Sequence, residues 1–130
     1  MTPTLFRILI AIYLTCVVLA IVGHVATSAT LPPALYEFVK LADIHGWMAS
    51  WVGIAYLACA TIATIGLILF KSWARPLFAA VTLFGAMPWD GATVYPAMEY
   101  AFINLEFVLA GAIIAAAYFS PVREKFTNKT

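Results

Sequence analysis

Four long apolar stretches dominate this chain, and charged residues are largely confined to the segments between them. The stretches cover residues 5–26, 46–70, 73–87 and 98–119. Only one acid or base, Glu106, lies well inside any of them. About 20 apolar residues suffice for an α-helix to cross the hydrocarbon core of a bilayer. The pattern therefore predicts an all-α, polytopic membrane protein, a four-transmembrane-helix bundle that forms a single integral membrane domain.

The third stretch is the weakest of the four predicted spans. From Lys71 to Pro88 the chain has about 17 residues, or about 25 Å at the helical rise of 1.5 Å per residue. That length barely crosses a hydrocarbon core of about 30 Å. Pro88 also disfavours helix at the preceding residue. We expect a short third helix followed by a loop.

The first outer connection, residues 26–45, carries a second helical pattern. Pro32 and Pro33 are tolerated in the first turn of a helix. Apolar and charged side chains then alternate at helical spacing: Leu35, Phe38 and Ala42 against Glu37, Lys40 and Asp43. The pattern predicts a short amphipathic helix in this outer loop, lying on the membrane surface or over the mouth of the bundle.

Composition agrees with a membrane setting and excludes several classes of function. The 130 residues are 65% hydrophobic and 10% charged, whereas a soluble domain is about half apolar and a quarter charged. The net charge of +1 and the absence of a large basic patch argue against a nucleic-acid partner. The first apolar run exceeds the roughly 7–15 residues of a signal-peptide core, so we expect a retained helix.

The basic residues predict the orientation. One side of the predicted bundle holds Arg7, Lys71, Arg75, Arg123, Lys125 and Lys129. The other side holds a single lysine and four acids: Lys40, Glu37, Asp43, Asp90 and Glu99. Lys and Arg are enriched in cytoplasmic loops. Both termini are therefore predicted in the cytoplasm. The compact chain and this charge pattern suggest a bacterial inner membrane.

Glu106 is the acid predicted to lie deepest in the membrane. It is about 12 Å along the helix from residue 98, close to the bilayer midplane. A charged carboxylate there is costly, so it should face the bundle, find a donor or be protonated. Two interpretations stay open. Glu106 binds a proton, cation or ligand, or it is a structural acid bonded to Tyr13, Tyr56 or Thr61.

The fourth predicted helix has two distinct faces. Glu99 and Glu106 are seven residues apart and share one face with Ile103, Ala110, Ile113 and Ala117. Asn104, Gly111 and Ala115 define another, with the small-residue spacing that allows close packing of membrane helices. We expect Asn104 to form hydrogen bonds between helices on that packed face. Ligand or ion candidates are thus Glu106, Asn104, Glu99 and Tyr56, and helix-packing candidates are Gly111 and Ala115.

A second polar group is predicted at the outer surface. It consists of His24, Glu37, Asp43, His45, Asp90 and Glu99. Imidazole and carboxylate together suit zinc, copper or iron, which makes His24, His45 and Asp43 candidate metal ligands. Their spacing matches no known metal signature, so solvated loop residues and interface histidines are the favoured interpretation. The sequence requires no cofactor.

No catalytic motif favours an enzyme. The chain lacks a phosphate-binding glycine loop, a His-Glu-x-x-His motif and a serine nucleophile elbow. In size and four-helix threading it resembles the small multidrug-resistance transporters. Those proteins carry an essential glutamate in their first helix, where this chain has no acid, so the resemblance implies no site residues.

Two functions remain after these exclusions. The first is a non-catalytic subunit, assembly or interaction partner in a bacterial membrane complex or homo-oligomer. Its partners would be the lipid bilayer and either other membrane subunits or copies of itself. The alternative is a small oligomeric transporter or channel that uses Glu106 as its proton or cation site.

Overall fold

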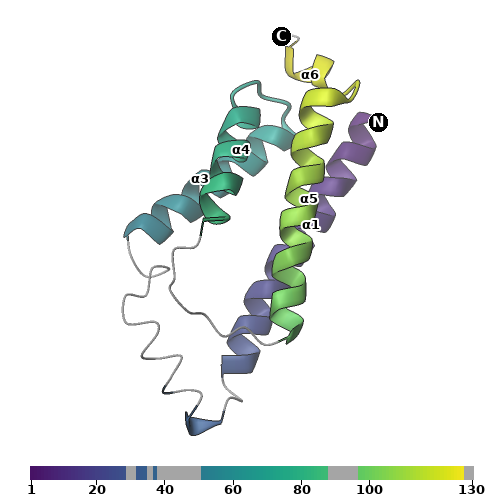
Figure 1. Cartoon of the computed structure of the whole chain (residues 1–130). Coiled ribbons are helices and arrows are strands. Elements are labelled where there is room, and N and C mark those ends of the chain that lie inside the picture. Colours follow the sequence, from purple (N-terminus) through teal and green to yellow (C-terminus); the bar gives the residue numbers. More distant parts are fainter. Residues whose placement is uncertain (29–31, 35–36, 38–50, 88–96, 128–130) are drawn as a thin grey trace.

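The computed structural model describes residues 1–28, 32–34, 37, 51–87 and 97–127, and in these ranges all regular structure is helical. The helices are α1 (Pro3–Ser28), α3 (Trp51–Ile68), α4 (Ala74–Gly85), α5 (Ala97–Phe119) and α6 (Arg123–Thr127) (Figure 1).

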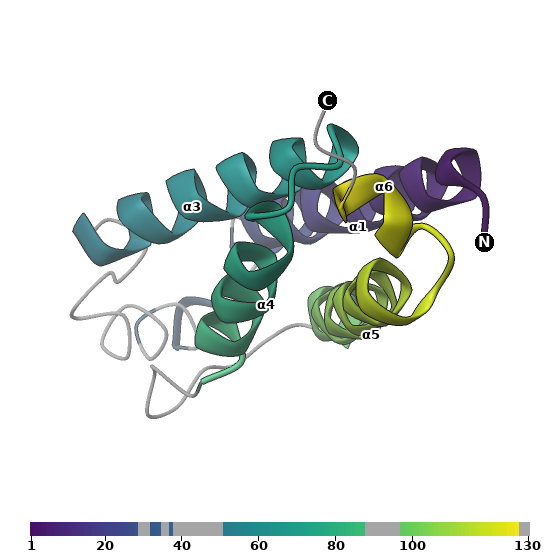
Figure 2. The ribbon, with the colours of Figure 1, turned by 90° about the horizontal axis from the view of Figure 1, so that it is seen from above.

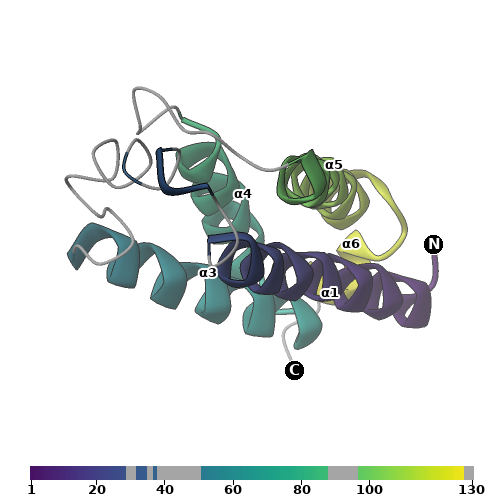
Figure 3. The same cartoon turned by 90° about the horizontal axis from the view of Figure 1, so that it is seen from below.

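Four helices form a closed ring of contacts. The strongest pairings are α1 with α5 and α3 with α4, and the ring is completed by α4 with α5 and α1 with α3. Seen from either end, α1 and α3 lie in one layer and α4 and α5 in the other (Figures 2 and 3). The short α6 folds back over the end of the bundle that carries the N-terminus (Figure 1). The architecture is therefore a four-helix arrangement with one capped end.

Three of these helices are long and apolar enough to cross a membrane. They are Pro3–Gly23 within α1, Trp51–Ile68 in α3 and Tyr100–Phe119 within α5. Most side chains on these segments are exposed in the single chain. Exposed apolar side chains are expected where lipid or another membrane helix is the surrounding medium. These three helices indicate an integral membrane protein.

The long helices of the structure correspond to the four predicted apolar stretches. Helices are confirmed for the stretches 5–26 and 98–119, as α1 and α5, and α3 forms the part of 46–70 from 51 to 68. The stretch 73–87 is helical as α4, but its 12 residues extend only about 18 Å. The amphipathic helix falls mostly outside the described residues. The sequence analysis did not predict α6.

The turn from α3 to α4 is built on an unusual residue. Phe70 has a φ of 54°, in the left-handed region where glycine is the usual occupant. Its N–H donates to the carbonyl of Leu67 at 3.1 Å, and the N–H of Lys71 donates to that of Gly66 at 2.8 Å. This is the Schellman pattern of helix termination. It allows the chain to reverse direction within a few residues.

Gly66 allows α3 and α4 to approach closely at this turn. A Cβ placed on Gly66 would lie 2.6 Å from the Cβ of Ala74 and 2.8 Å from the ring of Trp73. Real Cβ atoms do not come so close to their neighbours. The absence of a side chain at Gly66 is therefore a condition for the observed α3–α4 packing.

The buried core lies toward the end that holds the N-terminus and α6. Its members come from the start of α1, the end of α3, the first half of α4, the second half of α5, and α6 with the residue before it. They are Phe6, Ile10, Ala63, Leu67, Ala74, Phe78, Ala110, Ile113, Ala117, Val122 and Phe126. At the opposite end Trp51, the first residue of α3, is 86% exposed. In the described part of the chain, the buried core therefore lies toward one end of the bundle.

Candidate functional site

The intramembrane acid lies at the contact between α1 and α5. Glu106 is partly buried, and its Oε1 accepts a hydrogen bond from the hydroxyl of Tyr13 at 3.5 Å. The two residues are 93 positions apart, so the bond joins the first and last long helices. The acid is thus held by a polar partner inside the bundle, as the structural interpretation of Glu106 requires. A distance of 3.5 Å marks the weak end of hydrogen bonding.

Tyr56 on α3 lies within electrostatic range of Glu106. Its ring stacks on Phe84 of α4 with centroids 6.0 Å apart. Its hydroxyl lies against Gly85, where a Cβ would collide with it. The packing of α4 therefore positions Tyr56.

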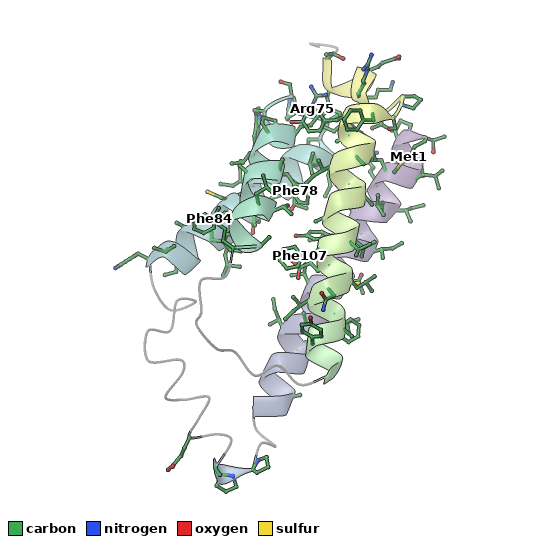
Figure 4. All side chains as sticks on the ribbon, viewed as in Figure 1. Met1, Arg75, Phe78, Phe84 and Phe107 are labelled. Atoms are coloured by element: carbon green, nitrogen blue, oxygen red, sulfur yellow. The ribbon has the colours of Figure 1, made fainter. Side chains whose placement is uncertain are left out.

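Phe78 closes the same region from α4. Its ring meets that of Tyr13 edge to face, with centroids 5.7 Å apart. Figure 4 shows Phe78 on the side of α4 that faces α5, deeper in the bundle than Arg75. The hydroxyl of Tyr13 and the carboxylate of Glu106 thus come from two helices, α1 and α5, and Phe78 of α4 packs on the tyrosine ring. This arrangement can hold one proton or a small cation, and it also suits a purely structural hydrogen bond.

A groove of about 510 Å³ lies between α3 and α4. Its lining includes Trp51, Tyr56, Cys59, Val81 and Phe84. The lining is almost entirely apolar. Tyr56 belongs to this lining and also lies within electrostatic range of Glu106.

The two predicted faces of the last long helix have different environments. On the Glu106 face, Ala110, Ile113 and Ala117 are buried, as expected of a face turned toward the bundle. On the other face, Asn104, Gly111 and Ala115 are exposed. A Cβ on Gly111 would meet nothing within 4 Å. No described residue of this chain therefore packs closely against Gly111.

Asn104 and several hydroxyl residues form hydrogen bonds to their own helices. The side-chain amide of Asn104 donates to the carbonyl of Tyr100 at 2.7 Å. Thr61, a predicted partner of Glu106, donates instead to Leu57 at 2.8 Å. Such bonds to the preceding turn satisfy a donor without another helix. Thr61 is therefore not the donor to Glu106 in this structure.

The remaining candidates cannot be placed. His45, Asp43 and Asp90 lie outside the described residues, as do the side chains of His24 and Glu99. Among the side chains that are described, no three of His, Cys, Asp and Glu converge on a possible metal site. The outer metal site stays a prediction. Cys16 and Cys59 are free, the first buried and the second exposed.

The sequence analysis missed an aromatic cluster with two arginines at the capped end. Phe6, Phe70 and Phe126 meet pairwise, with ring centroids 5.3–5.9 Å apart. Arg7 lies over Phe70 at 5.2 Å, and Arg75 lies over Phe126 at 5.1 Å. The alternation of basic and aromatic residues near helix ends was the available signal, but it does not reveal which residues meet.

Each arginine also reaches the end of another helix. Arg7 of α1 donates to the carbonyl of Ile68 at the end of α3, and Arg75 of α4 donates to that of Ala117 near the end of α5, both at 3.5 Å. The last carbonyls of a helix have no partner within it and carry partial negative charge. The two guanidinium groups thus act as caps between helices.

Comparison of the chain with protein-family models, with curated proteins and with solved structures finds no match.

Proposed function

We propose that this protein is a non-catalytic subunit or interaction partner in a bacterial membrane complex or homo-oligomer. The observation that carries the proposal is the outward face of α5, where Asn104, Gly111 and Ala115 are exposed at spacing suited to close helix packing. Val108, between them, is 68% exposed. A face made largely of small side chains, with a single amide that can form hydrogen bonds, allows another membrane helix to pack closely. The partners under this proposal are other membrane subunits or a second copy of the chain.

The topology that goes with this function has four crossings and both termini in the cytoplasm of a bacterial cell. Its support comes from the path of the chain. α3 ends at the capped end, whereas α5 starts at the opposite end (Figure 1). The connection must therefore run the length of the bundle, and α4 supplies about half of that path. The basic residues at the capped end agree with a cytoplasmic position.

Substitution of Gly111 tests the proposal. Gly111→Leu adds bulk to the outward face of α5 and should dissociate the complex or oligomer on a native gel of gently solubilised membranes. Gly23→Leu is the matched control, because a Cβ on Gly23 also meets nothing within 4 Å of this chain. Assembly that survives Gly111→Leu as well as it survives Gly23→Leu would overturn the proposal.

A specific observation also favours the alternative, a small oligomeric transporter or channel. Glu106 accepts a hydrogen bond from Tyr13 of another helix, and Tyr56, which lies within electrostatic range of Glu106, lines the apolar groove of α3 and α4. Glu106→Gln keeps the size of the side chain and an acceptor for Tyr13 but removes the ionisable group. If purified protein in liposomes moves protons or a cation and Glu106→Gln stops the movement, the alternative is correct.

A further inference from the structure

The capped end of the bundle concentrates positive charge. In the described part of the chain it carries five basic side chains, Arg7, Lys71, Arg75, Arg123 and Lys125, and one acid, Glu124. All of these except the partly buried Arg75 are exposed. They come from the start of α1, the α3–α4 turn, the start of α4, and α6. The helix contacts therefore gather charges from distant parts of the sequence on one surface.

Aromatic side chains set the depth of this surface in the membrane. Phe119 is 87% exposed and Trp73 is 47% exposed, and both lie at helix ends beside the charges. Tryptophan rings collect at the level of the lipid headgroups, so Trp73 is the residue that indicates the depth. The neighbouring cations are then at the level of the phosphates.

Two of the cations are fixed in place. Arg7 and Arg75 flank the touching rings of Phe70 and Phe126, and each is also bonded to a helix carbonyl. A guanidinium held by rings and carbonyls loses little conformational freedom when an anion arrives. α6 is held down by buried Phe126, with Arg123 and Lys125 on its exposed side. The charges are thus arranged before a ligand binds.

We propose that the capped end binds the phosphate groups of anionic phospholipids, selecting them over zwitterionic lipids from the adjoining leaflet. Charge complementarity supports this partner, because basic groups near an anionic membrane surface each contribute about 1 kcal/mol of attraction. The exposed apolar helices next to the cations receive the acyl chains. This inference concerns the lipid neighbours of the protein and goes beyond the assembly function proposed above.

Quenching of Trp73 fluorescence by brominated lipids measures the proposed selectivity. The other tryptophans, Trp47, Trp51 and Trp89, are replaced by Phe, and the variant is reconstituted in phosphatidylcholine mixed with phosphatidylglycerol. Bromine is placed on one lipid and then on the other. The ratio of quenching by brominated phosphatidylglycerol to quenching by brominated phosphatidylcholine gives the preference for the anionic lipid. Quenching by brominated phosphatidylcholine also shows that Trp73 still lies in the membrane.

The expected ratio is above one. Two substitutions should lower this ratio, and a third should raise it. Lys71→Gln and Lys125→Gln should each lower it, by up to about fivefold at low salt. Glu124→Gln, beside Lys125, should raise it because it removes a repulsive charge. A ratio of one, or a ratio that none of these substitutions changes, overturns the proposal.

A soluble anion provides the last arm of the experiment. Inorganic phosphate should lower the ratio no more than sodium chloride of the same ionic strength, because screening acts equally in both. If phosphate competes selectively, the site takes a soluble phosphate, and the assignment to lipid is wrong.

Discussion

The hydroxyl of Tyr13 on α1 donates to the carboxylate of Glu106 on α5, and this bond joins the two most extensively paired helices of the bundle. Hydrogen bonds between membrane helices contribute about 0.6 kcal/mol on average and at most about 1.7 kcal/mol. The 3.5 Å distance places this one at the lower end. The bond orients Glu106 more than it stabilises the bundle.

Tyr13→Phe should therefore lower the free energy of unfolding by only about 0.6 kcal/mol. The measurement is reversible unfolding in mixed micelles, combined with Glu106→Met, which removes the acceptor, and with the double variant. The coupling energy between the two sites should be small and favourable. A coupling energy of zero would show that the two side chains do not interact.

Gly66→Ala should destabilise the protein because the added methyl group meets Ala74 and Trp73 at the α3–α4 turn. Overpacking of this kind costs about 1–3 kcal/mol. Gly23→Ala, in open space on α1, is the control and should be neutral or stabilising, since alanine favours helix. Equal effects on thermal stability from both substitutions would contradict the close approach at Gly66.

Phe70 offers a test of the left-handed turn. Both Phe70→Ala and Phe70→Gly lose the ring contacts with Phe6 and Phe126 and the cation over the ring. Only glycine relieves the left-handed backbone, which costs other residues about 1–2 kcal/mol. Phe70→Gly should thus be the more stable of the two by about that amount in mixed-micelle unfolding. The opposite order would argue against a positive φ at this position.

Arg75→Met should loosen α6, because Arg75 lies over the rings of Tyr118 and Phe126 and bonds to the end of α5. A cation over a ring contributes about 0.5–1 kcal/mol at exposed sites and about 2 kcal/mol where it is desolvated, and the ring of Phe126 is buried. Amide hydrogen exchange in residues 123–127 should become several times faster, while exchange in α1 stays unchanged. Arg75→Lys should restore part of the protection. Uniform loss of protection would indicate general unfolding instead.

The long apolar helices were predictable because a long run of apolar residues is itself the signal of a membrane-spanning helix. The direction of Glu106 was also predictable, since it shares a helical face with Ala110 and Ile113, which are buried. Which residues lie on the same face of a helix depends only on the helical period. It needs no knowledge of the neighbouring helices.

Three other features could not be predicted, each for a physical reason. The left-handed residue at the end of α3 is Phe70, whereas glycine is the residue that usually signals this turn. The caps made by Arg7 and Arg75 depend on which helix ends lie side by side. The docking of α6 depends on a ring, Phe126, that meets partners far away in sequence. Such contacts follow from tertiary packing and leave no local pattern.

The aromatic cluster of Phe6, Phe70 and Phe126 has a consequence for the order of biosynthesis. Chains emerge from the ribosome with the N-terminal end first. The α3–α4 hairpin is local and can close as soon as Phe84 has been made, whereas α1 must wait for α5. Phe6 therefore enters the bilayer more than a hundred residues before Phe126 arrives to cover it. Until then α1 is an orphan helix, open to insertion chaperones and to other newly made membrane chains.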